Sequence, residues 1–177
     1  DEVGEDSKTG ETLIAIDPAL RSTGYAILTR SGRSTKAEAF GVIRNPAKLP
    51  LSGCLLAIRE QLSDLIRCHN PTEMAVEGVI YVQSYRTAIT LGAARGAAIL
   101  AVSERGIPVY EYAPRRIKQA VVGRGAADKQ QVAFMVRALL GLTETPSPDA
   151  ADALAIGLTH FQARDAAMIQ KTLLLPI

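Results

Sequence analysis

The chain has 177 residues, enough for one domain with a hydrophobic core, of which 47% are hydrophobic and 5% aromatic. No apolar run approaches the roughly 20 residues of a membrane span, and no signal peptide precedes the first strand, so we expect a cytoplasmic protein with no membrane partner. The net charge is +2, but residues 78–148 hold nine Lys and Arg against four acids. Such a segment fits either a polyanionic partner or an ordinary solvated surface.

Residues 1–11, "DEVGEDSKTGE", carry five acids and one lysine, which predicts a disordered acidic leader. Three apolar, β-branched runs follow at 12–17, 23–29 and 37–43, separated by turn residues. Their short spacing predicts an antiparallel meander.

Helical apolar spacing then extends from Ser52, a candidate N-cap, to a stop at Pro71. Both cysteines, Cys54 and Cys68, fall on this helix, where 14 residues separate them by about 21 Å. That exceeds the reach of a disulfide, and two reduced thiols are typical of a cytosolic protein.

The second half of the chain alternates strands and helices. A buried strand is expected at 73–78, a helix at 86–104, a strand at 108–112, and helices at 127–142 and from 147 onward. The order predicts an α/β fold with a mixed sheet flanked by helices. Gly92 and Gly96 cost the second helix about 1 kcal/mol each, which dense packing in the same subunit or a subunit interface would offset.

The last helix begins with two aspartates. Ser147 and Pro148 suit its first positions, and Asp149 and Asp152 then lie within roughly 60° of each other on one face. The helix dipole explains Asp149, but like charges three residues apart repel. A bound cation would turn that repulsion into a set of ligands.

Two further acids, Asp17 and Glu77, each end an apolar strand. Ligands gather at strand ends in open α/β sheets, although either acid could also simply begin a turn. Four carboxylates on three elements suit Mg²⁺ or Mn²⁺. Two such ions, about 3.5–4 Å apart, can bind the attacking and the leaving oxygen when a phosphodiester is cleaved in line.

Five segments of the chain closely resemble the RuvC family of Holliday-junction resolvases, in the family's order: "IDPALRSTGYAIL", "VEGVIYVQS", "LGAARGAAILAV", "VYEYAPRRIKQAVVGRGAADKQQVAFMVRALL" and "PDAADALAIGLTH". The resemblance spans residues 12–162 and leaves 163–177 as a C-terminal tail. It implies a ribonuclease H-like fold with a mixed five-stranded sheet, a homodimer, and Mg²⁺-dependent nicking of four-way DNA junctions in recombination and repair. Mn²⁺ is expected to substitute, and a branch-migration motor is a candidate partner.

The resemblance also assigns roles to individual residues. It places the catalytic, metal-binding carboxylates at Asp17, Glu77, Asp149 and Asp152, and functional lysines at Lys118 and Lys129. A lysine here either meets a phosphate or lies on a solvated helix surface. The DNA-binding candidates are Arg115, Arg116 and Arg124, together with Ile80 and Tyr81.

Three positions depart from the family pattern. Ala19 stands where the family usually has glycine, and Gly78 where it has glutamine. Ile80 aligns with an aromatic residue that, in the family, stacks on bases at the junction centre. Isoleucine can insert between bases but stacks poorly, so base opening and sequence preference are expected to differ from the family's. Two other functions remain open, a related nuclease acting on another structured nucleic acid and a protein that binds junctions without cutting them.

Overall fold

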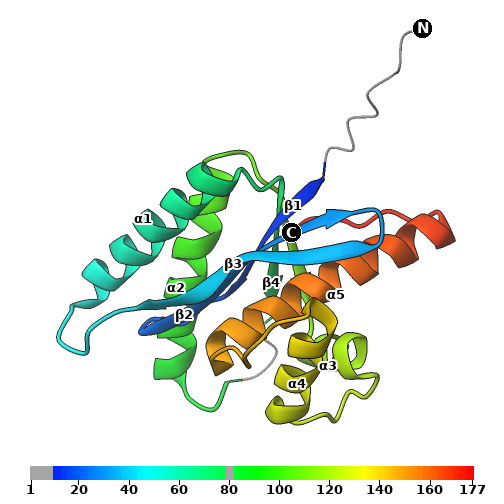
Figure 1. Ribbon diagram of the computed structural model, residues 1–177. Coiled ribbons are helices and arrows are strands. Elements are labelled where there is room, and N and C mark those ends of the chain that lie inside the picture. The colour runs from blue at the N-terminus through cyan, green and yellow to red at the C-terminus, as the bar shows by residue number, and fades with distance from the viewer. Residues whose placement is uncertain (1–9, 79–81) are drawn as a thin grey trace, which may run out of the picture.

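A five-stranded mixed sheet lies between two groups of helices in the computed structural model, which describes residues 10–78 and 82–177 (Figure 1). The α/β fold predicted from the sequence is confirmed. The elements are β1 (Glu11–Asp17), β2 (Ser22–Ser31), β3 (Ser34–Arg44), α1 (Leu51–His69), β4 (Glu73–Glu77), α2 (Tyr85–Ser103), β5 (Val109–Tyr112), α3 (Pro114–Val122), α4 (Lys129–Leu140) and α5 (Pro148–Gln170).

The strand order is β3-β2-β1-β4-β5. The first three strands form the predicted antiparallel meander, and β4 and β5 add to it in parallel with β1. Because β1 and β4 are parallel neighbours, Asp17 and Glu77 end at the same edge of the sheet. The start of β2 lies at that edge too, with Gly24 paired to Asp17.

Alternation along the strands separates two hydrophobic cores. Ile14 and Ile16 of β1 point toward α1 and α2, whereas Leu13 and Ala15 point toward α3, α4 and α5. The α5 side of the sheet includes the small residues Ala15, Ala26 and Ala75. Together with Gly157 of α5, these small residues allow α5 to lie close to the strands, because a Cβ at Gly157 would be 2.1 Å from a methyl group of Leu28.

Two expectations about helices were wrong. The helix α3 was not predicted, because its nine residues give only one short apolar repeat, Ile117 and Val121. The N-cap of α1 is Pro50 rather than Ser52, and the backbone N–H of Cys54 donates to the Pro50 carbonyl. Both cysteines lie on α1 and are free, as expected.

The last helix passes the expected domain boundary at residue 162 without a break and ends at Gln170. Lys171 then takes a left-handed conformation that turns the chain. The final residue returns to the sheet, where the N–H of Ile177 donates to the carbonyl of Val109 at 2.9 Å. None of the helices in the described ranges is long and apolar enough to cross a membrane.

Candidate active site

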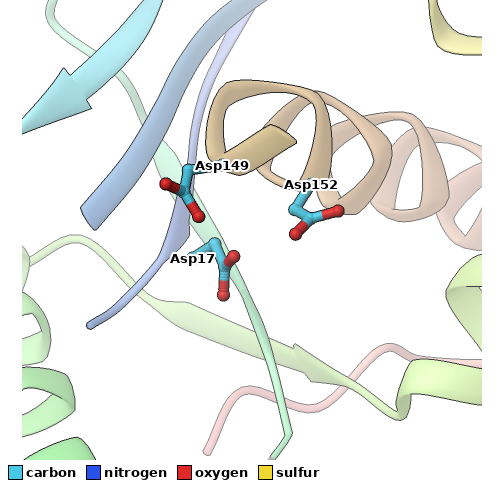
Figure 2. Close-up of side chains that lie close together, drawn as sticks. All are labelled: Asp17, Asp149 and Asp152. Carbon is cyan, nitrogen blue, oxygen red and sulfur yellow. The ribbon is translucent and has the colours of Figure 1, made fainter. Parts of the chain in front are cut away.

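Three aspartates meet at the sheet edge where β1 ends. Asp17 is the last residue of β1, and Asp149 and Asp152 occupy the first turns of α5 (Figure 2). One carboxylate oxygen from each lies within 4.8 Å of the others. All three side chains are partly buried. The two aspartates predicted to share a face of α5 therefore face the acid at the strand end.

Close backbone packing sets the position of α5 at this edge. A Cβ at Gly24 would lie 2.0 Å from the carbonyl oxygen of Asp149, so only glycine fits between β2 and the first turn of α5. Gly24 is also the residue that pairs with Asp17 across the β1–β2 ladder. The same glycine thus contacts the backbone that carries Asp149 and pairs with that of Asp17.

Glu77 lies beside this cluster rather than within it. It lines a hollow of about 180 Å³ together with Asp152, Lys118 and Lys129. The ammonium nitrogen of Lys129 is 3.6 Å from a carboxylate oxygen of Asp152, and the lysine side chain is 80% exposed. The hollow therefore brings together two predicted acids and both predicted lysines, from β4, α3, α4 and α5.

The carboxylates raise one another's proton affinity. Burial raises the pKa of Asp17 to about 7, and the charges of Asp152, Glu77 and Asp149 add to the shift. Burial and Asp152 also raise the pKa of Glu77, while burial raises that of Asp152 against the opposing effect of Lys129. So much negative charge in a half-buried space disfavours the fully ionised state.

This donor set fits a hard divalent cation. Carboxylate oxygens are the ligands that Mg²⁺ and Mn²⁺ prefer, and a cation would relieve the repulsion that raises these pKa values. Asp17, Asp149 and Asp152 lie close enough together to hold one ion. Glu77 would serve a ligand placed in the adjoining hollow.

The predicted arginines lie on α3, which also carries Lys118, and on the loop after it. Arg115, Arg116 and Arg124 are all exposed, and the Arg116 guanidinium lies 5.2 Å from the ring centroid of Tyr112. None of the three lines the hollow itself. The two other DNA-binding candidates, Ile80 and Tyr81, lie outside the described residues.

Two residues that support the acids were not predicted. The hydroxyl of Ser22 donates a hydrogen bond of 2.6 Å to Asp149, from 127 residues away in sequence. Arg95 of α2 donates to the backbone carbonyl of Glu77 at 2.7 Å and also bonds Glu111. A serine at a strand start and an arginine inside a helix have no distinctive pattern, so only their contacts identify them.

Comparison with known proteins places the chain among DNA resolvases. The family model for crossover junction endodeoxyribonuclease RuvC matches residues 13–160. The chain is 56% identical over 153 residues to the protein of that name from Akkermansia muciniphila, covering 86% of this chain and 92% of that one. It is 47% identical over 160 residues to its namesake from Halorhodospira halophila, covering 90% and 95%.

Solved structures agree with this relationship. The structure of Thermus thermophilus RuvC in complex with a Holliday junction substrate matches with a TM-score of 0.83 at 34% identity, over 88% of this chain and 96% of that one. The yeast mitochondrial Holliday junction resolvase shares the fold, with a TM-score of 0.60 at 13% identity over 87% and 81%. With its ribonuclease H-like sheet and its carboxylates at the predicted edge, the chain belongs to the RuvC family of crossover junction endodeoxyribonucleases.

Proposed function

We propose that this protein is an endonuclease that resolves four-way DNA junctions by nicking two opposed strands. The observation that carries the proposal is the convergence of Asp17, Asp149 and Asp152 at one sheet edge, with Glu77 in the adjoining hollow. Acids from three separate elements occupy the positions that the family resemblance assigns to its catalytic carboxylates. Lys118 of α3 and Lys129 of α4 line the same hollow, where a phosphate would lie.

The roles of the side chains follow from their placement. Asp17, Asp149 and Asp152 would hold a divalent cation, which supplies charge neutralisation and lowers the pKa of a bound water. Lys118 and Lys129 border the hollow, where their ammonium groups would offset the charge that develops on the phosphate oxygens. Arg115, Arg116 and Arg124 would bind the backbone without distinguishing sequence, so affinity would fall with salt.

The cofactor is Mg²⁺ in this proposal, with two ions per active site and Mn²⁺ as a substitute. The hard oxygen donors support this class of metal. The position of Glu77, outside the aspartate cluster but on the same hollow as Asp152, supports a second ion rather than a fourth ligand to the first.

The protein is a two-fold dimer in this proposal, because a junction must be nicked twice and a two-fold axis supplies two equivalent sites. The exposed face of α2 supports it. A Cβ at Gly92 or Gly96 would meet no described atom within 4 Å beyond the neighbouring backbone of α2 itself, so no other described element packs against these two positions. Tyr85, Ile89 and Leu100, all exposed, continue the same face with helical spacing.

The cellular setting is also part of the proposal. The two free thiols support a cytoplasmic location, because the cytoplasm keeps thiols reduced. A branch-migration motor would deliver the junction to the dimer. Cleavage of a synthetic junction would not require that motor.

A synthetic mobile four-way junction tests the proposal. With Mg²⁺, the wild-type protein should nick two opposed strands, and a denaturing gel should show paired products that EDTA abolishes. Replacing any of the four acids by its amide, for example Asp152→Asn, should abolish cleavage and retain junction binding. Ca²⁺ should support binding without cleavage, because its looser coordination misplaces the attacking water.

The alternatives predict different gels. A nuclease for another structured nucleic acid would cut an RNA–DNA hybrid faster than the junction. A protein that binds junctions without cutting them would shift the junction on a native gel and leave all four strands intact. Either result would contradict the proposed activity.

A further inference from the structure

A groove lies directly beside the hollow lined by Glu77 and Asp152, which we call the catalytic hollow. It has a volume of about 480 Å³ and runs between α4, the 145–148 loop and the first turns of α5. Lys129 and Asp152, the 3.6 Å ion pair, line both this groove and the hollow that contains Glu77. A strand that places one phosphate at the carboxylates would therefore bring its neighbouring nucleotide to the mouth of this groove.

The lining of the groove is mostly apolar. Phe134 of α4 forms one side and is 67% exposed, although an aromatic ring of this size is usually covered. Pro146 and Pro148 line the groove from the connecting segment and α5. The short side chains of Ala133 and Ala151 leave room between them. The shape and chemistry suit a flat, apolar object with a charged group attached at one end.

We propose that this groove, which we call the Phe134 groove, receives the base next to the scissile phosphate and stacks it on the Phe134 ring. The inference rests on the proposed nuclease function and adds a substrate contact to it. A nucleobase is flat, its two faces are apolar, and its phosphate would remain at the Lys129 end. Aromatic stacking accepts every base, so Phe134 would hold the strand in position, with a modest preference for bases that stack strongly.

Continuity with the carboxylates favours DNA over a protein partner. The groove shares a carboxylate and an ammonium group with the catalytic hollow, so any occupant must sit next to the cut strand. Exposure alone would not single out Phe134, because Tyr85 of α2 is 91% exposed. Phe134 differs because it lines a groove that is open to the catalytic acids.

Removal of the ring and removal of the base test the contact together. Phe134→Ala should lower the single-turnover cleavage rate of an intact junction about tenfold, and Phe134→Tyr should restore it because the ring is retained. Junctions with one abasic nucleotide, placed in turn on either side of the scissile phosphate, should reveal one position at which wild type and Phe134→Ala cut at equal rates. At that position neither protein has a base to stack.

Leu139→Ala is the matched control, because Leu139 is an exposed apolar residue of α4 that does not line the groove. It should cut every junction at the wild-type rate, and thermal melting should show all three variants folded. If Phe134→Ala cuts the intact junction at the wild-type rate, or is equally impaired on every abasic junction, the stacking contact is refuted while the nuclease assignment stands. If wild type cuts no four-way junction, both proposals fall.

Discussion

Gly24 and Asp149 are in backbone contact across the interface between β2 and α5. A Cβ at position 24 would lie 2.0 Å from the carbonyl oxygen and 2.6 Å from the carbonyl carbon of Asp149. Both clashing atoms are backbone, so no side-chain rotation relieves the overlap. The space for α5 therefore depends on the absence of a single methyl group.

Gly24→Ala should displace the start of α5 and lower the free energy of unfolding by about 1–3 kcal/mol, the usual cost of overpacking. The cleavage rate should fall by more than the loss of folded protein explains, because Asp149 moves with the helix. Gly53→Ala is the control, because the nearest atoms to its added methyl belong to the flexible side chain of Leu49, and because Gly53 lies in α1, where alanine is favoured. Urea unfolding and single-turnover rates measure both effects. Equal stability of the two variants would contradict the packing argument.

Ser22 orients the carboxylate of Asp149 through its 2.6 Å hydrogen bond. Ser22→Ala should leave the fold intact and raise the Mg²⁺ concentration needed for half-maximal cleavage roughly tenfold, the usual effect of removing a partner of a metal ligand. A titration of the cleavage rate with Mg²⁺ measures it. Ser34→Ala, at the exposed start of β3, should leave the titration unchanged. An unchanged midpoint for Ser22→Ala would show that Asp149 needs no such support.

Asp17 should make the metal-free protein less stable as pH rises. Its pKa is about 7 in the folded protein against 3.8 as the ordinary value, so between these pH values the folded state holds a proton that the unfolded state releases. The contribution of Asp17 to the free energy of unfolding therefore falls from about pH 4 to pH 7. Each pKa unit corresponds to about 1.4 kcal/mol, so Asp17→Asn should stabilise the protein at pH 8 by a few kcal/mol.

The measurement is the difference in the free energy of unfolding between wild type and Asp17→Asn, obtained by urea unfolding with EDTA at several pH values. Burial lowers the pKa of His160 to about 4, which gives stability the opposite trend from about pH 4 to pH 6.5. His160 is present in both proteins, so its effect cancels in the difference. Mg²⁺ at pH 8 should stabilise wild type more than the variant. A difference that is constant with pH would refute the raised pKa.

Lys118 and Lys129 should affect the chemical step more than binding. Lys118→Ala and Lys129→Ala should lower the single-turnover rate at saturating DNA by about 10- to 100-fold, as expected when charge stabilisation at the phosphate is lost. Arg115→Ala should mainly weaken affinity, and binding of every variant should weaken steeply with salt. If both lysine variants cleave at the wild-type rate when saturated with DNA, neither lysine contributes to the chemical step.

The exposed face of α2 predicts a dimer that a single bulky side chain disrupts. Gly96→Leu should shift the protein toward monomer in sedimentation and uncouple the two nicks on a cruciform plasmid. The added side chain would prevent the two α2 helices of the dimer from approaching each other closely. Lys36→Leu, on an exposed position of β3, controls for added surface hydrophobicity. A wild-type monomer at micromolar concentration that cuts both strands in one binding event would exclude the dimer.

Local sequence patterns determined most of the architecture. Alternation along β1 places Ile14 and Ile16 on one face and Leu13 and Ala15 on the other, and this is visible without coordinates because the strand period is two. Acids at the ends of two apolar runs, and two more at the start of an apolar helix, marked all four carboxylates. Short elements are harder to predict, and α3 was missed because nine residues contain too few turns to establish a helical period.

Only the tertiary structure decided how those acids are arranged. Asp17 and Asp149 are 132 positions apart, and their meeting depends on the antiparallel pairing of β1 with β2 and on how closely α5 packs over β2 at Gly24. The hydrogen bond from Ser22, the backbone contact at Gly24 and the groove at Phe134 arise from the same long-range packing. A local pattern records which face of an element is apolar, but not which distant residue will lie against it.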